Sequence, residues 1–117
     1  MTIRDIVLAA LETVLGNTWL VELPPDPTFP AIVFEISTTP ELQWVQGGGY
    51  DQHNVTVTVL AKTTNEVQNL TLQIKAALEL IPGYLQDGDY GDAGYEDDAS
   101  LYGEFSNHVI RRSKILG

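Results

Sequence analysis

Apolar residues recur at helical spacing near the start of the chain. Thr2 and Asp5 resemble a capping box, and Gly16-Asn17 tolerates the left-handed conformation that often follows a helix. The apolar positions between them are Ile3, Ile6, Val7, Ala10, Leu11 and Val14. This spacing places them on one helical face and predicts a helix over residues 3–15.

A second helical pattern begins near residue 63. Thr63 and Glu66 form a capping box in the sequence, and Pro82-Gly83 marks an end that the helix cannot pass. The apolar residues between these signals are Val67, Leu70, Ile74, Ala77, Leu78 and Ile81. They form a single stripe, so we expect an amphipathic helix with one buried face.

Strand patterns lie between the two helices. Residues 31–36 are β-branched and aromatic on both faces, which predicts a central strand covered on both sides. Residues 54–60 alternate strictly between Val and Thr, as expected of a half-buried strand. Together with residues 41–46, they flank the sequence Gly47-Gly-Gly-Tyr50 and predict a hairpin with a flexible tip.

Two weaker strands complete the pattern. Residues 19–23 predict a short strand before a proline-rich connection. Residues 105–112 predict a final strand whose alternation is interrupted by Asn107 and His108. The expected fold is a single α+β domain over residues 1–117, in the order α-β-β-β-α-β, with two helices packed on a mostly antiparallel sheet. The other sheet face is then left for solvent, for neighbouring subunits or for a channel.

The segment from Tyr84 to Tyr102 is acidic and glycine-rich. Eight of the 16 acidic residues lie between Glu79 and Glu104, and no Lys or Arg occurs between Lys75 and Arg111. Burying unpaired carboxylates costs several kcal/mol each, so we predict a loop that faces water, an ion or a partner.

Composition narrows the possible functions. The net charge of −10 repels phosphate backbones and disfavours tight nucleic-acid binding. The chain has no cysteine, which excludes disulfides and thiolate chemistry. Its apolar runs are shorter than the roughly 20 residues of a membrane-spanning helix, and its start resembles an amphipathic helix more than a secretion signal. We therefore expect the protein to stay in the cytoplasm where it is made.

Catalytic and metal motifs are weak. The segment from Asp87 to Asp98 departs from a calcium-binding loop, because Asp92 stands where glycine is required. Asp51, His53 and His108 are candidate metal ligands, although histidines in such positions are more often structural. The glycines at 47–49 lie between strands and lack the helix start that holds a phosphate. We therefore predict a non-enzymatic protein without a cofactor.

Three sequence features carry a family resemblance. They are the strand entry Phe29-Pro-Ala-Ile-Val33, the helix end Ile81-Pro82 and the element Glu96-Asp-Asp-Ala-Ser-Leu-Tyr102 before the last strand. With the order of elements, they make the chain resemble the tail terminator proteins of long-tailed bacteriophages, the minor tail protein U-like family. The resemblance implies a subunit of a six-fold ring at the head-proximal end of the tail tube, assembled in the host cytoplasm. Its implied partners are other copies of itself, the tail tube protein and the head-neck connector, while DNA passes through without specific binding.

Two groups of residues are candidates for this role. The first is an intersubunit interface of Glu96, Asp97, Asp98, Tyr102, Arg111 and Arg112. The second is a channel lining of Asp51, Asp87, Asp89 and Asp92. Alternatives to a tail terminator are another neck or tail-completion subunit of similar fold, a small host binding module and a metal-dependent hydrolase.

Overall fold

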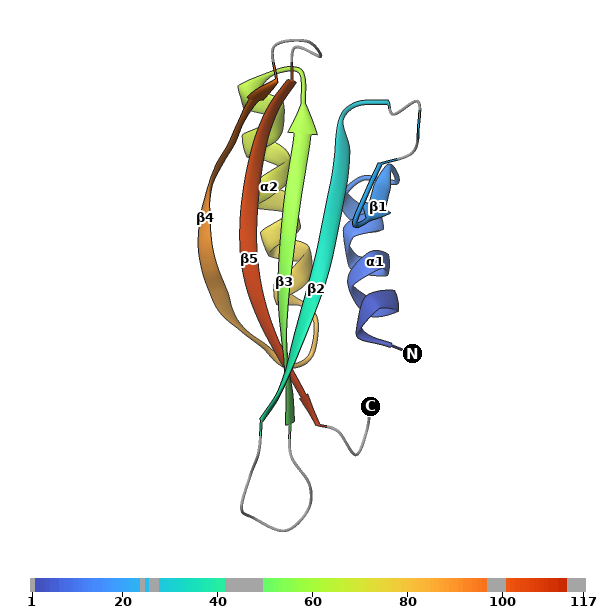
Figure 1. Cartoon of the computed structure of the whole chain (residues 1–117), viewed down its shortest axis with the longest axis vertical. Helices are drawn as coiled ribbons and strands as arrows, with labels where there is room; N and C mark the ends of the chain where they lie inside the picture. Colours follow the sequence, from blue (N-terminus) through green and yellow to red (C-terminus); the bar gives the residue numbers. More distant parts are fainter. Residues whose placement is uncertain (1, 24, 26–27, 42–49, 97–100, 114–117) are drawn as a thin grey trace.

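The computed structural model describes residues 2–23, 25, 28–41, 50–96 and 101–113. Two helices and five strands make up this part of the chain (Figure 1). In chain order they are α1 (Ile3–Val14), β1 (Thr18–Leu20), β2 (Ala31–Glu41), β3 (Tyr50–Ala61), α2 (Thr64–Glu79), β4 (Tyr84–Glu96) and β5 (Leu101–Ser113). The predicted α+β fold and its order of elements are confirmed, with one strand added near the end.

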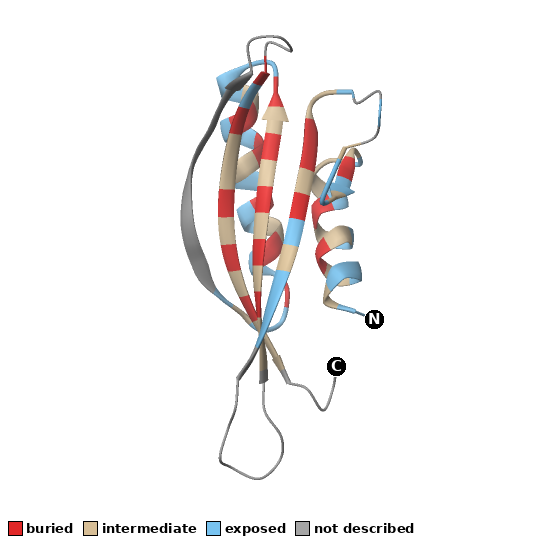
Figure 2. Cartoon of the chain, in the orientation of Figure 1, coloured by how far each residue is buried: buried red, intermediate tan, exposed pale blue. Residues whose placement is uncertain are grey.

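The five strands form one sheet in the order β1-β2-β3-β5-β4. β1 runs parallel to β2, and the remaining pairs are antiparallel. Phe34 lies opposite Val57, and Val55 lies opposite His108, so these side chains share the face that packs against both helices. Figure 2 shows the resulting alternation of buried and less buried residues along β3 and β5.

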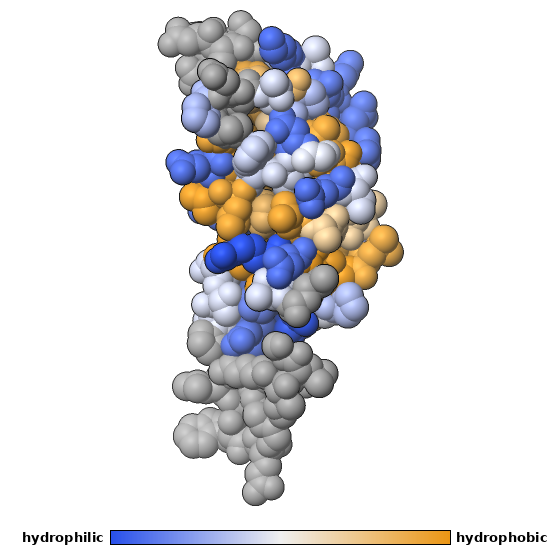
Figure 3. All heavy atoms as spheres, turned by 90° about the vertical axis from the view of Figure 1, so that its right-hand side faces the viewer, coloured by the Kyte–Doolittle hydropathy of each residue, from blue (hydrophilic) through white to orange (hydrophobic). Residues whose placement is uncertain are grey.

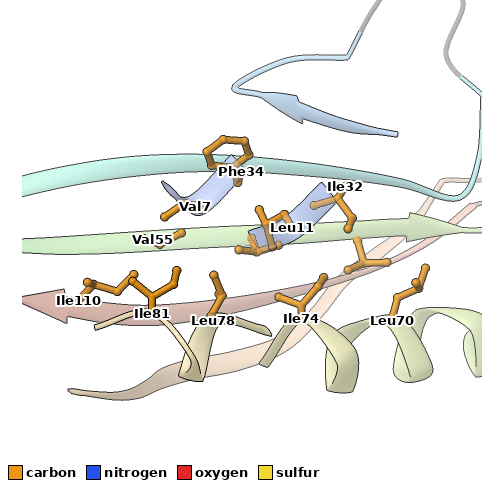
Figure 4. Packing of buried hydrophobic residues seen from close by; sticks show 12 residues of the cluster. Val7, Leu11, Ile32, Phe34, Val55, Leu70, Ile74, Leu78, Ile81 and Ile110 are labelled. Carbon is orange, nitrogen blue, oxygen red and sulfur yellow. The ribbon is translucent and has the colours of Figure 1, made fainter. Parts of the chain in front are cut away.

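The hydrophobic core lies between this sheet face and the helices (Figure 4). Its fully buried members include Val7, Leu11, Ile32, Phe34, Val55, Val57, Ile74, Leu78 and Ile110. Burying a side chain of this size contributes about 1.5 to 3 kcal/mol, so the two predicted helical stripes are the main source of cohesion between the layers. The apolar periodicity of both helices is therefore confirmed as the core-facing pattern.

A threonine side chain caps the start of each helix as predicted, and the reciprocal bond of a capping box is present at α1. Thr2 Oγ1 accepts from the backbone N–H of Asp5, and Asp5 Oδ2 accepts from the backbone N–H of Thr2, which completes a capping box. Thr63 Oγ1 accepts from the N–H of Glu66 at the start of α2. These bonds satisfy N–H groups that the first helical turn leaves without partners, and each cap is worth about 1 kcal/mol.

The strands before α2 differ from their predicted bounds. β1 ends at Leu20, earlier than predicted. β2 continues to Glu41 and pairs along its whole length with β3, which begins at Tyr50. The first strand of the hairpin is therefore the one predicted over residues 31–36, extended to Glu41. The predicted strand over residues 41–46 falls, after Glu41, outside the described residues.

The prediction that residues 31–36 are covered on both sides is wrong. Ile32 and Phe34 are buried against the helices, whereas Glu35 is exposed on the opposite face, which no described element covers. A strand with large apolar residues on both faces is typical of a doubly covered sheet. Here Val33 is instead half-buried beside its neighbours in the sheet.

The prediction of an acidic loop after Tyr84 is also wrong for residues 84–96, which form β4 at the sheet edge. This segment is rich in Gly and Asp, which have low strand propensity, so its sequence did not predict a strand. It forms one because β5 pairs with its backbone. The register shifts between Tyr84 and Gln86, between Asp87 and Tyr90 and between Asp92 and Gly94. Such bulges accommodate a sequence that does not alternate regularly.

The final strand is longer than predicted, and its alternation is regular. Ser106, His108 and Ile110 are buried in succession, so the polar residues occupy the core-facing positions. Neither of the described helices is long and apolar enough to cross a membrane.

Candidate functional site

The lower ends of β2 and β3 extend beyond both helices (Figure 1). We call residues 37–41 and 50–54 the arm. His53 lies at its base with only 7% of its surface exposed, and its Nδ1 is 2.8 Å from Thr38 Oγ1. Burial lowers the pKa of His53; nearby Asp51 opposes this effect and Arg112 adds to it. The imidazole is therefore neutral at pH 7 and serves to join the two strands of the arm.

Asp51 and Arg112 are cross-strand partners on β3 and β5. The basic end of β5 therefore has an acidic neighbour within its own chain, which the sequence did not suggest. Asp51 is also separated from the acidic strand, because β5 lies between β3 and β4. The predicted channel-lining residues consequently occupy two separate places in the fold.

A second polar group lies inside the core. His108 is 2% exposed; its Nε2 is 2.8 Å from Ser106 Oγ and its Nδ1 is 3.1 Å from the Tyr84 hydroxyl. A neutral imidazole can donate through one nitrogen and accept through the other, and both hydroxyls can match either arrangement. The group therefore satisfies its buried polar atoms and ties the start of β4 to β5.

This buried group resembles a catalytic serine–histidine pair in its distances alone. Ser106 is 7% exposed and lies opposite Val57 on the core-facing side of the sheet, so its hydroxyl is poorly placed to reach a substrate carbonyl. The same burial separates His108 from any role as a third metal ligand with Asp51 and His53. Within the described part of the chain, no three His, Asp or Glu side chains come together as a metal site.

The four acids of β4 follow one edge of the sheet in their backbone positions. Asp87 lies opposite His108, Asp92 opposite Glu104 and Glu96 opposite Leu101, while Asp89 falls within a bulge. Charged residues and bulges on an edge strand discourage pairing with the edge of another sheet. The acidic pattern therefore protects a 13-residue edge from indiscriminate β-pairing.

The predicted interface residues lie at both ends of β5. Tyr102 is opposite Tyr95 on one side and Ala61 on the other, and is 37% exposed. Arg111 and Arg112 lie at the opposite end of the strand. Asp97 and Asp98 lie outside the described residues. The strand thus separates Glu96 from the basic end, as the sequence predicted.

Apolar side chains reach the surface beside the short edge strand β1. Trp19 is 39% exposed and Val21 is 64% exposed, and Glu22 follows them. Figure 3 views the side of the molecule that carries α1 and β1, where apolar side chains appear between hydrophilic ones. We call Trp19, Val21 and Glu22 the β1 patch; the sequence did not predict it as a functional surface.

The backbone of the β1 patch is strained. Val21 has φ 70°, and the N–H of Glu22 donates to the carbonyl of Leu20 at 2.8 Å across it, which forms a γ-turn. A β-branched residue at positive φ is an outlier that costs about 1 to 3 kcal/mol. The N–H of Val21 also donates to Phe34 at 2.9 Å, which holds the turn against β2.

A second exposed apolar pair flanks the turn between α2 and β4. Leu80 and Leu85 are both exposed, and we call them the turn patch. Between them, Gly83 has φ 94°, and its carbonyl accepts from the N–H of Arg111 at 2.8 Å. A Cβ at this glycine would collide with the carbonyl oxygen of Arg111. The turn patch therefore sits against the basic end of β5.

Comparison with known proteins identifies the family. The chain matches the family Tail completion protein gp17 over residues 6–105. No curated protein matches it. A chain from the virion of a native gene transfer agent particle shares the fold, with a TM-score of 0.59 and 10% sequence identity, covering 95% of this chain and 94% of that one. Since the family match spans most of the sequence, the chain belongs to the tail completion protein gp17 family and is a structural component of the virion tail.

Proposed function

We propose that six copies of this chain form a ring at the head-proximal end of the tail tube. The ring ends polymerisation of the tube and joins it to the head-neck connector. The match to a tail completion family over residues 6–105 carries this proposal. The uncovered sheet face and the projecting arm support it, because both provide surface for neighbouring subunits. The protein acts by binding and blocking, without bond chemistry.

Charge suits a ring through which DNA passes. Each copy has a net charge of −10, so a ring of six surrounds its channel with negative charge that repels the DNA backbone. We propose Asp51, Asp87, Asp89 and Asp92 as channel-lining residues. Replacing three of them by lysine should slow DNA ejection, since each added cation strengthens phosphate contact. Normal ejection through an intact variant ring would show that these acids face outward.

The basic end of β5 is a proposed contact between subunits. Arg111 and Arg112 of one copy meet the acidic end formed by Glu96, Asp97 and Asp98 of the next, with Tyr102 beside it. A head-to-tail ring repeats one such contact at every junction. Replacing both arginines by glutamate should weaken assembly at low salt, and adding Asp97→Lys and Asp98→Lys should restore part of it. Indifference to the arginine changes would refute the contact.

Native mass and particle imaging together test the ring. The purified chain, alone and mixed with tail tube protein, should show a six-copy species. In the assembled particle, this chain should lie between the tube and the neck, and removing it should give tubes of uncontrolled length. A different position in the neck, with tube length unchanged, would favour the alternative of another tail-completion subunit.

A further inference from the structure

The two exposed apolar patches lie at opposite edges of one sheet. The β1 patch flanks the first strand in the order β1-β2-β3-β5-β4, and the turn patch flanks the last. A head-to-tail ring needs two different surfaces on opposite sides of each subunit. A two-fold dimer would instead need one surface that matches itself. The placement of the patches therefore fits a heterologous contact between copies of this chain.

Charge distinguishes the two edges in a complementary way. Residues 5–61, which include β1, β2 and β3, contain no Lys or Arg, and Glu22 and Glu35 are exposed there. Three of the six basic residues belong to α2 and the basic end of β5, namely Lys75, Arg111 and Arg112. The β1 edge is thus acidic apart from Arg4 on α1, while the turn patch lies beside these cations as well as beside Glu79 and Asp51. Opposite charges at the rim of an apolar contact set its orientation.

The strain at Val21 gives the β1 patch a second sign of function. The strained turn projects an apolar side chain toward solvent, where it gains nothing from burial in the isolated chain. Unfavourable backbone conformations cluster at binding and switch regions. In a contact that buries Val21, the free energy gained from burying this side chain would offset the cost of its strained backbone.

We propose that the β1 patch of one copy docks onto the turn patch of the next, with Glu22 beside Arg111 and Arg112. Trp19 and Val21 then pack against Leu80 and Leu85 at each junction. This inference rests on the proposed ring and assigns its apolar contact surfaces. Glu22 is thus an alternative to Asp97 and Asp98 as the acidic partner of Arg111 and Arg112.

Two single variants test the contact. Val21→Glu and Leu85→Glu should each weaken self-association by about tenfold or more, because each places a charge in an apolar contact. Leu72→Glu is the matched control, since Leu72 is 67% exposed on α2 but belongs to neither patch. Circular dichroism establishes that each variant is folded. Leu80→Glu replaces Leu85→Glu if the latter misfolds, and Trp19→Glu replaces Val21→Glu.

Mixing the two variants distinguishes head-to-tail from symmetric contact. A junction can still form between the intact turn patch of the Val21 variant and the intact β1 patch of the Leu85 variant. Native mass spectrometry of the mixture should therefore show dimers with one copy of each variant and no ring. Homodimers of either variant would overturn the head-to-tail assignment.

The remaining outcomes separate this contact from the ring itself. Normal rings from both variants would overturn the contact and leave the proposed function standing. A wild-type chain that remains monomeric, both alone and with tail tube protein, would contradict the ring and the contact together. Rescue of Arg111→Glu and Arg112→Glu by Glu22→Lys supports Glu22 as the partner, whereas rescue by Asp97→Lys and Asp98→Lys alone would exclude it.

Discussion

The two edges of the sheet differ in the features that prevent unwanted pairing with other strands. β1 has three residues, runs parallel to its neighbour and ends in a strained turn with exposed apolar side chains. β4 has 13 residues, is acidic and bulged, and begins after a turn beside the basic end of β5. A short edge offers little backbone for unwanted pairing, whereas a long one needs charges and bulges. Each edge is therefore a poor template for pairing with the edge of another sheet.

The largest expected effect concerns the turn that begins the β4 edge. Gly83→Ala should destabilise the fold by about 2 to 4 kcal/mol, because the new Cβ meets the Arg111 carbonyl at a positive φ. Gly16→Ala is the control, since a Cβ there meets nothing within 4 Å. Urea unfolding of both variants measures the difference. Equal midpoints would show that the turn relaxes easily.

Removing one hydroxyl should loosen the β4 edge selectively. Tyr84→Phe deletes the partner of His108 Nδ1 and should cost about 1 to 2 kcal/mol. Amide hydrogen exchange should rise in β4 and remain unchanged in β1. Uniform exchange throughout the sheet would mean that the hydrogen bond supports the whole fold rather than this edge.

At the β1 edge, a glycine, which usually destabilises a strand, should not lower the stability of the isolated chain. Val21→Gly relieves the positive φ and should leave stability unchanged or raise it by about 1 kcal/mol, while self-association falls. Val33→Gly, in the extended backbone of neighbouring β2, should instead destabilise the fold. Thermal unfolding at a concentration that keeps the chain monomeric makes the comparison. A clear loss of stability in the Val21 variant would contradict the strain.

The smallest expected effect is on the pH dependence of stability and comes from His53, which lies near the charges of Asp51 and Arg112. Its pKa in the folded chain is below the ordinary histidine value of 6.5, mainly because of burial. The unfolded chain therefore binds a proton first as the pH falls, and stability decreases from about pH 7 downward until the folded histidine also titrates. His53→Gln should flatten this part of the stability profile relative to the wild type. An unchanged slope between pH 7 and pH 5 would refute the assignment.

Local patterns in the sequence determined the helices and the centre of the sheet. The apolar stripes, Thr2 with Asp5, Thr63 and the valines of β3 predicted these elements because each signal acts over a few neighbouring residues. The phage tail assignment likewise followed from elements that the sequence displays in order. The candidate interface and channel residues remain predictions, since they depend on other copies of the chain.

Only the tertiary structure decided the edges and the buried polar group. β4 is a strand because β5 supplies its hydrogen-bond partners, and an acidic, glycine-rich sequence carries little local signal of that pairing. The register with β3 turns Ser106 and His108 toward the core, and Tyr84, more than twenty residues away, completes the hydrogen bonding of His108. The two apolar patches came to opposite edges through strand order, which no local spacing encodes. Pairing between distant segments is a property of the whole chain, and this is the physical reason that the sequence predicted the elements better than the surfaces they form.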